Sequence, residues 1–89
     1  MIDDSETVEA TVRSVLRDVL GIDQGRSDAF EAGSALFGAL PEFDSMAVAT
    51  VLTELEDRLG IVIDDDEVEA EIFDTFGALV GFARGKALG

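Results

Sequence analysis

The chain has 89 residues, of which 47% are hydrophobic, so it is long enough for one small domain with a buried core. Its 20 acidic and 6 basic residues give a net charge of −14. This charge argues against nucleic acids and anionic membrane surfaces as partners, because both are bound through cationic side chains. It favours basic protein partners, and solubility alone explains it equally well.

The sequence contains no cysteine and no histidine. A disulfide framework, a thiolate metal site and a cysteine nucleophile are therefore excluded, and the commonest general base is missing. The first residues are acidic, unlike the charged-then-apolar order of a signal peptide, and no apolar run is long enough to span a membrane. We expect a monomeric, cytoplasmic protein that does not insert into membranes.

Apolar residues recur at helical spacing over residues 5–20 and predict a first helix. Asp3, Asp4 and Ser5 offer capping oxygens at its start, and acidic residues in a first turn also suit the helix dipole. Gly21 is placed to end this helix in the left-handed conformation.

Residues 21–43 predict a long loop, because they hold four glycines and the only proline of the chain. A helical turn over residues 27–31 fits within this loop. Three apolar residues are the expected anchors that pin the loop to the core, namely Leu36, Phe37 and Leu40. A loop with such anchors is better explained as an ordered segment than as a linker.

Residues 45–59 carry the clearest helical pattern of the chain. Asp44 precedes this segment and can cap it, and Gly60 follows it as a C-terminal stop. Its apolar face consists of Val48, Val51, Leu52, Leu55 and Leu59.

Residues 61–63 are β-branched but too few to build a sheet, so we expect an extended connector. Residues 64–67 have the spacing of a capping box and predict a short helix over 65–72. Thr75 is placed to cap a last helix over 75–85. The sequence thus predicts three longer helices and one short helix, whose apolar stripes can be buried only against each other. We therefore expect an all-α, small four-helix bundle, with residues 1–89 as a single domain.

Ser45 stands at the start of the second long helix, where a serine is usually only a cap. Asp44 can take that role and leave the Ser45 hydroxyl free, and a helix N-terminus favours a covalently attached phosphate. A serine nucleophile needs an activating base, and without histidine we expect no catalytic residue and no enzyme activity. The residues alone permit a phosphate-bearing Ser45 without identifying the group.

Acidic residues concentrate between positions 42 and 74, where 12 acids and one base give a net charge of −11. This segment predicts either a docking face for basic partners or a merely solvated surface. The run at 64–67 does not match a calcium-binding EF-hand loop, because no glycine lies between Gly60 and Gly77. We expect no metal site.

These features, taken in order and spacing, resemble acyl carrier proteins over nearly the whole chain, most strongly over residues 36–79. The Asp-Ser-Leu of that family appears here as Asp-Ser-Met at 44–46. The family sequence that follows the acidic helix appears as Leu-Gly-Ile at 59–61, and the start of its last helix appears as Thr-Phe at 75–76.

The resemblance implies that a phosphopantetheinyl transferase attaches 4'-phosphopantetheine from coenzyme A to Ser45, next to Asp44 and Met46. The chain would then tether acyl intermediates as thioesters and present them to loading ligases, synthases or transferases that have basic docking patches. A peptidyl (aminoacyl) carrier and an unmodified acidic interaction module with the same fold are the alternatives.

The resemblance also implies roles for two further sets of residues. The expected docking acids are Glu42, Glu54 and Asp57. The candidates to line an acyl-chain cavity, for which core packing is an equal explanation, are Val51, Leu55, Ile63 and Ile72. Phe43 stands where many fatty-acid and polyketide carriers have glycine. In this feature the chain resembles stand-alone carriers of dedicated bacterial pathways, such as those that accompany exosortase or exopolysaccharide gene clusters.

Overall fold

The computed structural model describes residues 4–88, with side chains from Glu6 onward, so the capping side chains predicted at Asp3, Asp4 and Ser5 lie outside what it describes. Within this range the elements, in chain order, are α1 (Asp4–Leu20), α2 (Gln24–Asp28), α3 (Ser45–Leu59), the 3₁₀ turns η1 (Asp65–Glu67) and η2 (Ala70–Phe73), and α4 (Phe76–Leu88). The prediction of an all-α fold is confirmed.

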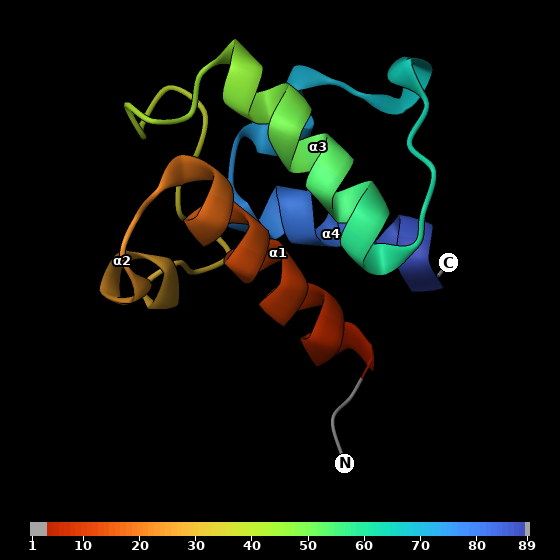
Figure 1. The fold of residues 1–89 in the computed structure, drawn as a ribbon, viewed down its shortest axis with the longest axis horizontal. Helices are drawn as coiled ribbons and strands as arrows, with labels where there is room; N and C mark the ends of the chain where they lie inside the picture. The colour runs from red at the N-terminus through yellow and green to blue at the C-terminus, as the bar shows by residue number, and fades with distance from the viewer. Residues whose placement is uncertain (1–3, 89) are drawn as a thin grey trace.

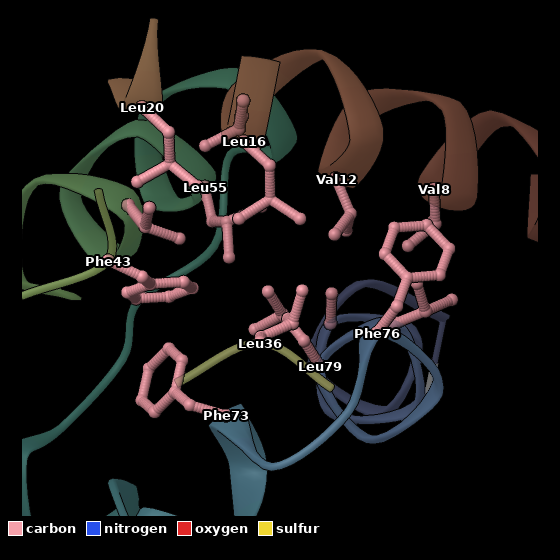
Figure 2. Close-up of a cluster of buried hydrophobic side chains, with 14 of the residues drawn as sticks. Val8, Val12, Leu16, Leu20, Leu36, Phe43, Leu55, Phe73, Phe76 and Leu79 are labelled. Carbon is pink, nitrogen blue, oxygen red and sulfur yellow. The ribbon is translucent and has the colours of Figure 1, made fainter. Parts of the chain in front are cut away.

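Helix α1 packs against both α3 and α4, and the connection that holds η1 and η2 returns along α3 towards its N-terminal end (Figure 1). Each long helix turns one apolar face inwards, as its 3.6-residue spacing requires. Figure 2 shows these side chains converging with residues from the loops. The buried core consists of Val8, Val12, Val15, Leu16, Leu20, Ile22, Leu36, Phe43, Val51, Leu55, Phe73, Phe76, Leu79, Val80 and Ala83.

The helix ends follow the capping residues in the sequence. Gly21 and Gly60 have φ values of 67° and 65°, in the left-handed region where a side chain is disfavoured, and they end α1 and α3. The Ala78 N–H donates to Thr75 Oγ1 at 3.1 Å, which is the cap expected for α4. Helix α4 then continues to Leu88, three residues beyond the predicted end.

The predicted long loop is tied to the start of α4 by backbone hydrogen bonds. Leu36 N–H donates to Asp74 O at 3.1 Å and Phe37 N–H to Phe73 O at 3.0 Å. In the other direction, Phe76 N–H donates to Ser34 O at 2.8 Å. These bonds satisfy the polar groups of a segment that would otherwise bury them unpaired.

Arg13 of α1 fastens the other part of this loop. Its guanidinium donates to Phe30 O at 3.1 Å and to Ser27 O, and it lies 4.7 Å from the centroid of the Phe76 ring. One half-buried side chain therefore joins α1, the loop and α4, through charge-assisted hydrogen bonds and a cation–π contact.

Two further predictions of secondary structure differ from the structure. The helical turn in the loop lies at Gln24–Asp28 rather than 27–31, because Asp23 accepts from Arg26 N–H at 2.8 Å and starts the turn earlier. Residues 65–72, predicted as one short helix, form η1 and η2 separated by extended residues, Val68 and Glu69. Extended residues advance about 3.3 Å each against about 1.5 Å in a helix, and so they span the distance to the buried Phe73.

Candidate functional site

The N-terminus of α3 is capped by Asp44 and not by Ser45. Asp44 has an extended backbone, and its Oδ1 accepts from the Ala47 N–H at 2.9 Å. Ser45 is the first residue of the helix itself. The carboxylate therefore satisfies a free backbone donor of the first turn, and the hydroxyl of Ser45 is not needed for this purpose.

Ser45 is exposed, and no hydrogen bond within residues 6–88 uses its side chain. The other serines in this range are less accessible. Ser27 is buried and donates to Gln24 O at 3.0 Å, Ser34 is half-buried and accepts from Glu31 N–H at 2.8 Å, and Ser14 is half-buried on α1. Among the serines whose side chains are described, Ser45 presents its hydroxyl most openly to a reacting partner.

The segment that leads into Ser45 is held in place by Phe43. This side chain is 3% exposed, and its ring lies edge-on to Phe73 and Phe37, with centroids 5.7 and 6.0 Å apart. Edge-to-face pairs at such distances add to the free energy of apolar burial. Phe37, by contrast, is 50% exposed, and the prediction that it anchors the loop in the core is wrong.

Glu42, one residue before Phe43, is fixed by Arg26 of α2. The guanidinium donates to Oε2 at 2.6 Å and to Oε1 at 3.2 Å, a two-point contact that defines the direction of both side chains. This hydrogen bond lowers the pKa of Glu42 below its ordinary value. The pair links α2 to the segment immediately before the serine.

A cleft of about 240 Å³ opens beside Ser45. Its lining comes from the loop, from α3 and from the η1–η2 connection, and consists of Phe37, Ser45, Val48, Val68, Glu69, Ala70 and Phe73. Of these seven residues, Ser45 and Glu69 alone have polar side chains. An apolar hollow beside an exposed hydroxyl suits a ligand that is attached at the hydroxyl and has an apolar part.

The wall of this cleft that contains Val68 is held by one ion pair. Lys86 Nζ of α4 lies 2.8 Å from both carboxylate oxygens of Glu67, and Asp64 N–H donates to Glu67 Oε2 at 2.9 Å. The lysine hydrogen bond, followed by the backbone one, lowers the pKa of Glu67. Glu67 therefore closes the predicted capping box and joins η1 to α4 at the same time.

Replacing Lys86 with glutamine should raise the pKa of Glu67 towards its ordinary value and loosen residues 65–70. A carboxyl whose folded pKa is depressed contributes stability above the ordinary pKa, and this is lost as the pH falls through the folded pKa. In Lys86→Gln this contribution is smaller, and its loss is complete at a higher pH, because the folded pKa of Glu67 lies closer to the ordinary value. An NMR titration of Glu67 and amide exchange over 65–70 measure both effects.

The matched control for that experiment is Arg17→Gln, which removes the more distant contact of Arg17 with Asp18, at 3.7 Å on α1. It should leave the Glu67 titration and the exchange of residues 65–70 unchanged. An unaltered Glu67 titration in Lys86→Gln would contradict the role given to this ion pair.

Residues 10–83 match the family model described as phosphopantetheine attachment site. The fold is similar to the solution NMR structure of a holo acyl carrier protein from Nitrosomonas europaea, with a TM-score of 0.78 and 44% sequence identity over 88% of this chain and 92% of that one. The chain belongs to the acyl carrier protein family. A comparison with curated proteins gives no match.

Family membership defines the general role of this acyl carrier protein. The family consists of carriers rather than catalysts, and its prosthetic group is a covalently attached phosphopantetheine. Such carriers interact with a phosphopantetheinyl transferase and with biosynthetic enzymes. Across residues 4–88, none of the helices has the length and apolar character needed to cross a membrane.

The structure separates the residues that the sequence predicted for an acyl-chain cavity from the cleft beside Ser45. Val51 and Leu55 are fully buried in the core, and Ile63 and Ile72 are half-buried and pack against it. None of the four lines the cleft. Val68 and Phe73 line the cleft with Val48 but are not among the predicted cavity residues, because the extended path of the η1–η2 connection brings them there.

The predicted docking acids differ in their surroundings. Glu42 is engaged by Arg26, and Glu54 accepts from Arg58 Nε at 3.0 Å. Asp57 is exposed, and no ion pair or hydrogen bond of its side chain occurs within the described residues. Met46 is 81% exposed beside the serine. In the same range, no group of three or more acidic side chains is placed to hold a metal ion.

Proposed function

We propose that Ser45 is the attachment point of 4'-phosphopantetheine, transferred from coenzyme A, and that the chain carries acyl groups between partner enzymes without catalysis of its own. The observation that supports this most directly is the exposed Ser45 hydroxyl, left free by Asp44, at the edge of a mainly apolar cleft. The prosthetic group supplies a terminal thiol on which an acyl group is held as a thioester. The chain has no cysteine, so this thiol has no competitor in the protein.

The residues around Ser45 have distinct parts in this proposal. The positive end of the α3 dipole favours the phosphodiester charge beside the first turn. Phe43 and the Arg26–Glu42 pair hold the preceding segment, so Ser45 is presented in one position. The cleft next to Ser45, lined by Val48, takes the apolar part of the arm and its cargo. Met46 offers an exposed apolar contact to the transferase.

Incubation with a broad-specificity phosphopantetheinyl transferase, coenzyme A and magnesium should add one phosphopantetheine to the protein, detected by intact mass. Ser45→Ala should abolish the addition completely, because the acceptor hydroxyl is gone. Its circular dichroism and melting temperature should change little, since Asp44 remains the cap.

Ser14→Ala is the matched control, because Ser14 is a half-buried serine on α1, and this variant should be modified at the normal rate. A wild-type chain that gains no mass, or a Ser45→Ala chain that gains the same mass, would overturn the proposed attachment site.

The same assay tests docking. The exposed Asp57 and its acidic surroundings should attract a basic transferase, so the rate should fall as salt is added.

A further inference from the structure

Every basic residue of the carrier forms an ion pair with one of its own acids. The six side chains are distributed over α1, α2, α3 and α4, so no helix presents a cation that is free of an acidic neighbour. The pairs are Arg13–Glu9, Arg17–Asp18, Arg26–Glu42, Arg58–Asp18 and Arg58–Glu54, Arg84–Glu9, and Lys86–Glu67. The charge that remains for an approaching ligand is therefore negative.

The cleft beside Ser45 has this negative character at its own wall. Glu69 is its one charged lining residue, and its side chain has no hydrogen bond or ion pair within the described part of the chain. The other lining side chains, apart from Ser45, are apolar. A carboxylate on a ligand in this cleft would lie beside the exposed, unpaired carboxylate of Glu69, and this repulsion of like charges is unfavourable.

We infer that the cleft discriminates cargo by charge: it holds short, uncharged acyl groups and leaves carboxylate-bearing acyl groups in solvent, with Glu69 as the specificity-determining residue. The volume of about 240 Å³ supports a short cargo, because drug-sized ligands occupy pockets of about 300–1,000 Å³. This inference rests on the proposed attachment at Ser45, from which the flexible arm folds back and brings its terminal acyl group to the cleft.

The test compares two cargoes of equal carbon number, pentanoyl and glutaryl, which differ in the terminal carboxylate of the second. The transferase loads each from its coenzyme A thioester, and intact mass confirms the loading. The readout is the change in methyl and amide chemical shifts of Val48, Val68 and Ala70, relative to the form with an unloaded arm. Pentanoyl should shift these signals, and glutaryl should shift them about fivefold less at low salt, from the repulsion of two carboxylates near a surface.

Glu69→Gln removes the like charge and should bring the glutaryl shifts close to those of pentanoyl. The matched control is Glu71→Gln, an exposed acid two residues further on that does not line the cleft, and it should keep the difference. Equal shifts from the two cargoes in the wild type, or an unchanged difference in Glu69→Gln, would overturn the inference. A chain that gains no mass would instead reject the attachment at Ser45, so the two failures are distinguishable.

Discussion

Phe43→Ala is expected to destabilise the carrier by about 3–5 kcal/mol, the usual cost of emptying a buried phenylalanine site. The Phe43 side chain is 3% exposed, and its ring makes edge-to-face contacts with two others, so the cavity has little freedom to collapse. Native proteins have a total stability of about 5–15 kcal/mol, so a loss of this size removes a large fraction of it and should lower the urea midpoint markedly. Urea denaturation followed by circular dichroism gives the difference in unfolding free energy.

Phe37→Ala is the matched comparison. It also removes a phenylalanine side chain, from the exposed residue whose ring contacts Phe43. At 50% exposure, its loss should cost about 1 kcal/mol or less. Equal destabilisation by the two substitutions would mean that Phe43 does not hold the segment before Ser45 in the way described.

Gly77→Ala should also destabilise the protein, by about 1–3 kcal/mol, although alanine is the better helix former. A Cβ atom at Gly77 would lie 2.7 Å from Ala32 O, the atom to which the Gly77 N–H donates at 2.9 Å. The loop would have to move away from α4 and lose its backbone hydrogen bonds. Thermal unfolding should show a lower melting temperature for this variant.

The same substitution in the same helix should have the opposite sign at Gly81. This residue is exposed, and a Cβ atom there meets no other atom within 4 Å. Gly81→Ala should therefore stabilise α4 by about 0.5–1 kcal/mol through helix propensity alone. If both variants shifted stability in the same direction, the close approach of Ala32 to Gly77 would not be the cause.

Local signals in the sequence were sufficient for some elements and insufficient for others. Helix α3 has the predicted bounds because a capping Asp44, an apolar stripe and a terminal Gly60 agree over the same residues. In the η1–η2 connection, the capping box fixes only one turn, and the path beyond it depends on where Lys86 and Phe73 lie in the folded chain. No short-range pattern contains that information.

One part of the candidate site could be predicted from the sequence, and another part could not. Ser45 and its cap Asp44 are neighbours in sequence, so their relation could be predicted from helix capping alone. The cleft could not be predicted, because Phe37 and Val68 line it with Ser45 only when the loop is hydrogen-bonded to the segment before α4. Likewise, the engagement of Glu42 depends on Arg26, which is 16 residues away on another element.

The internal pairing of all six cations also bears on how copies of the carrier behave towards one another. Two copies of the chain both have a net negative charge, so they repel each other. The Debye length is about 8 Å at physiological ionic strength, so salt does not remove this repulsion when the two surfaces are close. Crowded carriers should therefore stay apart, whereas the basic docking patches proposed for partner enzymes would still be attracted. Such mutual avoidance would reduce collisions between two loaded carriers and favour those between a carrier and an enzyme.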